Sequence, residues 1–194
     1  MAVVLGLGNP GARYARTRHN LGWRVVEALV GRWKARPVES VPEYRAWEAA
    51  PAGRTVALLS ALTYMNESGR ALSVWRERHP LELAELLVVA DDVYLPVGMV
   101  RLRGSGSSGG HRGLASIEAA LESRDYARLR IGVGATPADT LREHVLEEFR
   151  EEEEATADEA ILKAADAVEC WAYEGLLAAM NRFNRRVKKE VPES

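Results

Sequence analysis

The chain has 194 residues, of which 47% are hydrophobic and 28% charged, as is ordinary for one soluble globular domain with a real core. Its 26 basic and 28 acidic residues give a net charge of −2, so overall charge does not indicate nucleic-acid binding. The single cysteine, Cys170, excludes an internal disulfide framework and a cysteine-based zinc site. No signal peptide or membrane-spanning segment is visible, so we expect a cytoplasmic protein.

Strands and helices alternate along the chain. A buried strand is predicted over residues 2–7 and a helix over residues 20–34, with a glycine-rich loop between them. Turn residues bound further apolar runs, which predict strands at 44–48, 55–59, 86–90, 99–103 and 128–134. Helical spacing predicts helices around residues 71–75 and over 114–121.

The final third is predicted to be helical. A stripe of apolar residues at helical spacing should face the core, and it comprises Ile161, Leu162, Ala165, Val168, Trp171 and Ala172. The interleaved elements predict an α/β class, single-domain layered fold. We expect a central mixed, mostly parallel sheet flanked by helices, with a helical C-terminal segment. This domain should span residues 1–194, with residues 185–194 frayed.

The loop after the first strand matches a dinucleotide-binding fingerprint, since Gly6, Gly8 and Gly11 have the spacing Gly-x-Gly-x-x-Gly. Three features argue against that interpretation. Pro10 removes a backbone N–H from the turn, and the polar residues after Gly11 do not open a helix. The acidic residue expected about 20 positions later, at the end of a second strand, is missing. We therefore expect no nicotinamide or flavin cofactor.

Two other site patterns are weak. Residues 106–110 match the Gly-x-Ser-x-Gly nucleophile elbow, but a Gly/Ser-rich stretch does so by composition, and the next helix begins several residues later. We favour a flexible loop whose backbone approaches a large ligand, and an ordinary mobile loop is the alternative. The four histidines, His19, His79, His111 and His144, have no helix-face metal spacing, so no metal is expected. His79 and His144 are interpreted as surface residues.

Four polar residues stand where chemistry is possible. His19 lies at the junction of the first loop and helix, where a cap or a packed histidine is the commoner role. Asp91 ends a buried strand and could orient an imidazole or cap a turn. Asn9 and Asn66 carry amides suited to a peptide unit or an oxyanion, although each could be a turn or cap residue.

Together these residues belong to sequence blocks that resemble bacterial-type peptidyl-tRNA hydrolase. The first block, residues 6–22, reads Gly-Leu-Gly-Asn-Pro-Gly-x-x-Tyr-x-x-Thr-Arg-His-Asn-x-Gly and is specific on its own. Further blocks follow in the family's order at residues 63–69, 91–98, 109–117, 128–134 and 145–149. The resemblance covers most of residues 3–149, and the helical tail matches only in kind.

The resemblance implies an enzyme of translation that hydrolyses the ester between a peptide and the 3′ ribose of tRNA, which recycles the tRNA without a metal or another cofactor. His19 is similar to the family's general base and Asp91 to its orienting partner, with Asp92 the less favoured choice. Asn9 and Asn66 resemble the amides that hold the peptide backbone and position water or the developing oxyanion. Such chemistry needs only a modest base, a held water and oxyanion donors.

The resemblance also implies contacts with tRNA. Tyr14, Tyr64 and Met65 would line the cleft near the terminal adenosine, and Arg103 and Arg130 match the basic pair for the 5′ phosphate. The expected partner is peptidyl-tRNA, bound by a monomer with no membrane association. A non-catalytic RNA-binding protein on the same fold is the alternative.

Two positions depart from the family pattern. Arg112 replaces the usual asparagine, so the substrate contact of that amide is in doubt. Arg112 could instead contact a phosphate or a ribose of the tRNA. Ala90 replaces a histidine before the strand-end aspartate, and we expect little consequence from that change.

Overall fold

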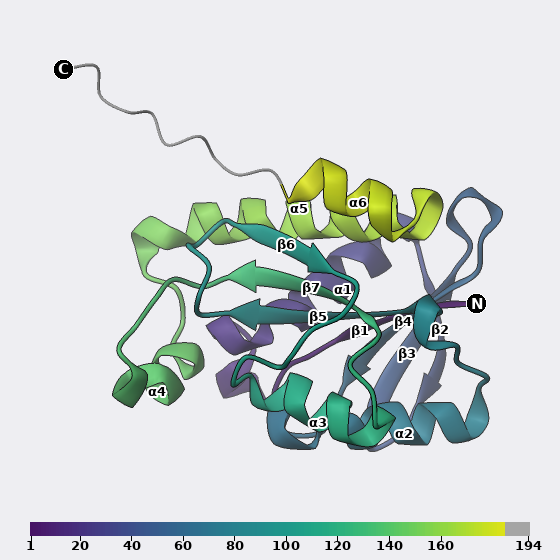
Figure 1. Ribbon diagram of the computed structural model, residues 1–194, viewed down its shortest axis with the longest axis horizontal. Coiled ribbons are helices and arrows are strands. Elements are labelled where there is room, and N and C mark those ends of the chain that lie inside the picture. Colours follow the sequence, from purple (N-terminus) through teal and green to yellow (C-terminus); the bar gives the residue numbers. More distant parts are fainter. Residues whose placement is uncertain (185–194) are drawn as a thin grey trace.

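The apolar run near the N-terminus forms the centre of a seven-stranded sheet in the computed structural model, which describes residues 1–184 (Figure 1). The strand order is β2-β3-β4-β1-β5-β7-β6. The four central strands run parallel, and they are β4 (Val56–Ala61), β1 (Ala2–Gly6), β5 (Leu86–Asp92) and β7 (Ala127–Gly132). The antiparallel partners at the two edges are β2 (Arg36–Ser40), β3 (Tyr44–Ala49) and β6 (Val100–Arg103).

Helices cover both faces of this sheet. The helices on one face are α1 (Leu21–Trp33), α5 (Glu151–Glu174) and α6 (Leu176–Phe183), and those on the other are α2 (Ser68–Arg78) and α3 (Arg112–Leu121) (Figure 1). Successive strand residues point to opposite faces, so Val4 packs under α1 while Val3 and Leu5 join the core beneath α2 and α3. The predicted single α/β domain with a mixed sheet is confirmed.

The parallel strands bring distant segments together. Their carboxyl ends meet at one edge of the sheet, which is where open α/β sheets bind ligands. The loop that follows β1 carries Asn9 and His19, and the segment after β4 carries Asn66. Asp91 lies at the end of β5 itself. The sheet thus gathers these side chains from across the sequence.

Four local predictions need correction. Strand β2 was missed because it is an exposed edge strand that contains Pro37 and changes register there. The short helix α4 (Leu141–Leu146) was also missed, and α3 begins at Arg112 rather than at residue 114. Leu162 is 55% exposed on the outer face of α5, so it does not belong to the apolar stripe. The expected frayed tail, residues 185–194, lies outside the described residues.

Helix α1 packs unusually close to the sheet. A Cβ atom on Gly22 would press on the backbone nitrogen of Leu7 and lie only 2.5 Å from the carbonyl oxygen of Val89. A Cβ atom on Gly6 would in turn meet the backbone of Gly22. Gly6 and Gly22 therefore allow close packing of α1 against the sheet, whereas the glycines of a dinucleotide-binding loop bring the backbone close to phosphate.

We expect Gly22→Ala to lower the free energy of unfolding by about 3 kcal/mol, because rigid backbone on two strands must move to admit the methyl group. Gly31, in the same helix, has no atom within 4 Å of its potential Cβ position other than its chain neighbours and the backbone of α1. Gly31→Ala is therefore the matched control and should raise stability by about 0.5–1 kcal/mol through helix propensity. Urea unfolding measures both. Equal effects of the two substitutions would contradict the close approach.

Candidate active site

A cleft of about 550 Å³ opens at the carboxyl edge of the sheet. Its walls come from four loops and from α4, and they include residues of the segments 9–19, 64–66, 91–94, 109–112 and 138–146, with Arg130. This volume lies within the range of small-molecule sites, so the cleft can hold a terminal nucleoside or an aminoacyl group but no folded RNA.

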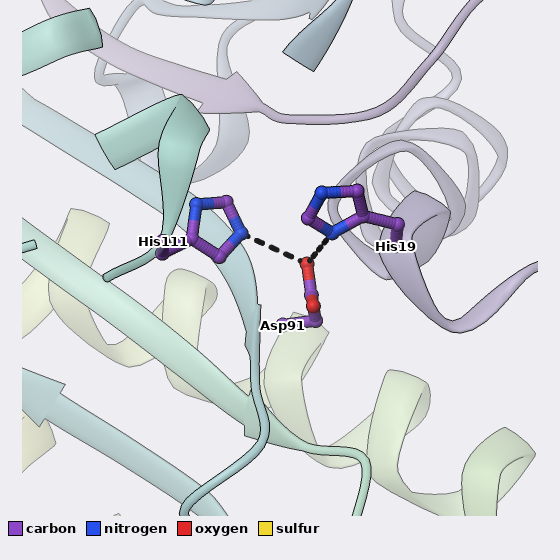
Figure 2. Close-up of side chains that lie close together, drawn as sticks. All are labelled: His19, Asp91 and His111. Atoms are coloured by element: carbon purple, nitrogen blue, oxygen red, sulfur yellow. Dashed lines mark hydrogen bonds and ion pairs between the residues drawn. The ribbon is translucent and has the colours of Figure 1, made fainter. Parts of the chain in front are cut away.

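His19 and Asp91 meet at the floor of the cleft. His19 lies in a single 3₁₀ turn (Arg18–Asn20) just before α1, and its Nδ1 is 2.7 Å from Oδ1 of Asp91 (Figure 2). Asp91 is 1% exposed, while the imidazole of His19 reaches the cleft. The other ring nitrogen of His19, Nε2, points away from the carboxylate (Figure 2). His19 and Asp91 are therefore joined by a hydrogen bond, and Nε2 of His19 remains available to a ligand.

His111 also binds Asp91, which the sequence did not lead us to expect. Its Nε2 lies 3.0 Å from the same Oδ1 atom, and its ring centroid is 5.0 Å from that of His19 (Figure 2). His111 is the N-cap residue of α3, where its Nδ1 accepts the backbone N–H of Leu114 at 3.2 Å. One carboxylate oxygen therefore joins two imidazoles.

These contacts fix the positions of the protons. Because Nδ1 of His111 accepts a hydrogen bond, the proton of the neutral ring is on Nε2, which donates to Asp91. Burial alone would raise the pKa of Asp91, but the adjacent His19 and His111 hold that pKa well below its ordinary value. The carboxylate is thus ionised and only accepts, so His19 donates from Nδ1. The lone pair on Nε2 of His19 is then free to take a proton.

The same three side chains could in principle hold a cation, since their donor atoms lie within 4.8 Å of one another. The hydrogen bonds give a different account of the cluster. Both imidazole nitrogens that face Asp91 carry protons, and a metal would have to displace them. The donor set therefore fits a hydrogen-bonded base better than a metal centre.

Asn9 is held from two sides at the cleft wall. Its backbone N–H donates to Oδ1 of Asn20 at 2.8 Å, and its carbonyl accepts from Nδ2 of Asn20 at 3.0 Å. Its side-chain oxygen accepts the backbone N–H of Met65 at 2.8 Å, which fixes the orientation of the amide. The NH₂ group is left to donate to a ligand. Asn20 is fully buried, and its position in the sequence did not predict this role.

The other predicted substrate residues also lie on the cleft. Asn66 is exposed there and does not cap α2, whose N-cap residue is Glu67. Tyr14 and the half-exposed Tyr64 contribute aromatic surface, and the buried Met65 also lines the cleft.

The arginines are divided between the cleft and the neighbouring strand. Arg112, at the first position of α3, is exposed and lines the cleft. Arg130 also lines it, but its guanidinium already contacts Oδ2 of Asp92 at 3.2 Å and the carbonyl of Ser108. Arg103 is exposed on β6, outside the cleft lining.

Asp92 does not compete with Asp91 for His19. One of its oxygens accepts the backbone N–H of Tyr94 at 2.8 Å, and the other contacts Arg130. Adjacent residues of a strand point to opposite sides, which separates the two carboxylates.

Comparison with known proteins identifies the family. The family model described as peptidyl-tRNA hydrolase matches residues 3–191. The chain belongs to the peptidyl-tRNA hydrolase family. The peptidyl-tRNA hydrolase of Syntrophomonas wolfei is 44% identical over 184 residues, covering 95% of this chain and 100% of that protein. That of Roseiflexus castenholzii is 47% identical over 186 residues, covering 95% and 87%.

Solved peptidyl-tRNA hydrolase structures share the fold. The crystal structure of the Acinetobacter baumannii enzyme superposes with a TM-score of 0.89 at 31% identity, covering 95% of this chain and 94% of that one. Among the helices of the described residues, none is both long and apolar enough to cross a membrane. The resemblance inferred from the sequence is confirmed.

Proposed function

We propose that this member of the peptidyl-tRNA hydrolase family cleaves the peptidyl-tRNA ester by general-base catalysis at His19. The observation that carries the proposal is the hydrogen bond from His19 Nδ1 to the buried Asp91, with Nε2 left free. The substrate is a peptide esterified to the 3′ ribose of tRNA. The products are a free peptide and a tRNA that can be charged again.

The chemical step begins when Nε2 of His19 takes a proton from water as the water oxygen attacks the ester carbonyl. The negative charge of Asp91 stabilises the imidazolium that forms, and its hydrogen bond keeps the ring in the required tautomer. His19 then returns the proton to the departing ribose oxygen. His111 holds the carboxylate from the other side. No metal is needed, because the base, not a metal, activates the water.

Two amides supply the remaining polar contacts. The free NH₂ group of Asn9 can donate to a carbonyl of the bound peptide, and free aminoacyl-tRNA lacks that peptide bond. Asn66, exposed on the opposite segment, can position water or donate to the developing oxyanion. Asn9 thus contributes to substrate choice and Asn66 to the chemical step.

The alternative of a non-catalytic RNA-binding protein is not favoured. Family membership and the buried Asp91 with two imidazoles both fit catalysis. Burying an ionised carboxylate is costly unless it is well satisfied, and binding of RNA phosphates would not require it.

We also propose how the tRNA is held. Tyr14 and Tyr64 would stack with the terminal adenosine. Arg103 and Arg130 would bind the 5′ phosphate, although Arg130 must then share its charge with Asp92. Arg112 would contact phosphate or ribose at the cleft mouth.

The protein is further proposed to act as a monomer in the cytoplasm, where translation supplies its substrate.

We expect His19→Ala to lower kcat by about 100- to 10,000-fold, because the water loses its proton acceptor. KM for N-blocked aminoacyl-tRNA should change little, since the base acts in the transition state. Release of deacylated tRNA at low salt measures both. His79→Ala is the matched control: His79 stacks on Trp75, outside the cleft lining, and this variant should keep full activity. Full activity of His19→Ala would contradict the assignment.

Salt titration of KM tests the arginine contacts. The plot of log affinity against log salt concentration has a negative slope. Loss of one phosphate contact in Arg103→Gln should make this slope less steep by about one unit. Arg112→Asn should do the same if Arg112 binds phosphate, but should leave the slope unchanged if it binds ribose. Arg76→Gln, on the exposed surface of α2, is the control. A slope in Arg103→Gln equal to that of the control would remove Arg103 from the proposed phosphate site.

A further inference from the structure

One wall of the cleft is a short helix at the carboxyl edge of the sheet. Helix α4 has six residues, and Leu141, Arg142, Val145 and Leu146 line the cleft. None of its residues is fully buried. A helix of this length is marginal by itself, so its position must come from contacts with other elements.

Arg18, next to His19, provides such contacts. Its side chain is 3% exposed, and Nη1 donates to the carbonyl of Glu148 at 2.8 Å and to that of His144 at 3.3 Å. Its Nη2 donates to Oε2 of Glu153 at 2.8 Å. One guanidinium therefore binds α4, the link that follows it and the first turn of α5.

Backbone and aromatic contacts strengthen the same junction. The backbone N–H of Arg18 donates to the carbonyl of Glu147 at 3.0 Å, and Thr17 forms an isolated β-bridge with Glu148. The guanidinium lies 5.1 Å from the centroid of the Phe149 ring, which is itself buried. The segment that carries His19 and the segment that follows α4 are thus bound side by side.

Glu153 is a firm anchor for this arrangement. It occupies the first turn of α5, where hydrogen bonds from the side chain and the backbone N–H of Arg150 reinforce the contact with Arg18. These bonds, with Arg18, lower the pKa of Glu153 to about 2, so the carboxylate stays ionised at neutral pH. At its other side, α4 is tied to the end of β7 through Nε2 of His144 and the carbonyl of Val133, 3.0 Å apart.

We propose that Arg18 is a positioning residue that fastens the α4 wall of the cleft to the turn that carries His19. We call the contacts of Arg18 with His144, Glu148 and Glu153 the strap. The inference rests on the proposed function of the cleft, because it assigns the strap a role in binding the same substrate. An apolar residue could fill the same space but would leave the carbonyls of His144 and Glu148 without their donor. The guanidinium fork serves three acceptors at once, which lysine cannot reproduce.

Steady-state kinetics of Arg18→Gln, Arg18→Lys and Glu153→Gln test the proposal. Loosening α4 should raise KM for N-blocked aminoacyl-tRNA about tenfold in Arg18→Gln, as for the loss of a charged hydrogen bond. Arg18→Lys should fall between this variant and the wild type. The kcat value and the shape of its pH profile should be retained, because Asp91 still orients His19. The KM value of the double variant Arg18→Gln/Glu153→Gln should be no higher than that of Arg18→Gln, because both substitutions break the same contact.

Arg32→Gln is the matched control, since Arg32 on α1 pairs with Asp166 and Glu169 of α5 outside the cleft lining. Like Arg18→Gln, this substitution removes an ion pair to α5, but it should leave KM unchanged. Hydrogen exchange of the amides of residues 141–149, measured without substrate, should be faster in Arg18→Gln and unaltered in Arg32→Gln.

Equal KM values in Arg18→Gln and Arg32→Gln, or unaltered exchange in residues 141–149, would overturn the proposed strap. A fall in kcat with an altered pH profile and unchanged KM would also overturn it, because Arg18 would then act on His19 alone. Failure of the wild-type protein to cleave the substrate would refute the proposed function instead, and the exchange measurement would still test the strap.

Discussion

The site depends on one oxygen atom, Oδ1 of Asp91, which accepts hydrogen bonds from two imidazoles. Each bond has a different consequence. The bond from His19 fixes the tautomer whose free nitrogen faces the cleft, and the bond from His111 helps to keep the buried carboxylate ionised. An unpaired carboxylate at this depth would take up a proton and would no longer accept the hydrogen bond from His19. The geometry proposed for catalysis therefore depends on both rings.

Several elements of the fold position Oδ1 of Asp91 and its two imidazole partners. Strand β5 carries Asp91 to the carboxyl edge of the sheet, and the N-cap of α3 places His111 beside it. The close packing of Gly22 against β1 and β5 sets the start of α1, immediately after His19 and Asn20. Asn20 then holds Asn9 at the cleft wall. A few close contacts thus hold His19, Asp91 and Asn9 in fixed positions relative to one another.

Much of this arrangement could be predicted from the sequence. Long apolar runs such as residues 86–90 identified the central strands, and the block around His19 identified the family. Edge strand β2 and helix α4 gave no comparable signal, because one is exposed and broken by Pro37 and the other spans only six residues. Leu162 showed that an apolar residue at helical spacing can still face outward.

The roles of His111, Asn20 and Arg18 could not be predicted for a different reason. Each lies within a recognised block, but its role depends on partners far away in the sequence, such as Asp91 for His111 and Glu153 for Arg18. Spacing along a chain does not encode such contacts. A histidine followed by a helix start and preceded by Gly109 and Gly110 was the one available signal for His111.

Nitrogen-15 chemical shifts of the histidine rings at neutral pH test the proposed role of His19, because they distinguish the two imidazole tautomers. We expect His19 to carry its proton on Nδ1 and His111 on Nε2, and we expect Asp91→Asn to alter the signals of both rings. A proton on Nε2 of His19 in the wild-type protein, with Nδ1 unprotonated, would contradict general-base catalysis by His19. No lone pair would then face the cleft to accept a proton from water.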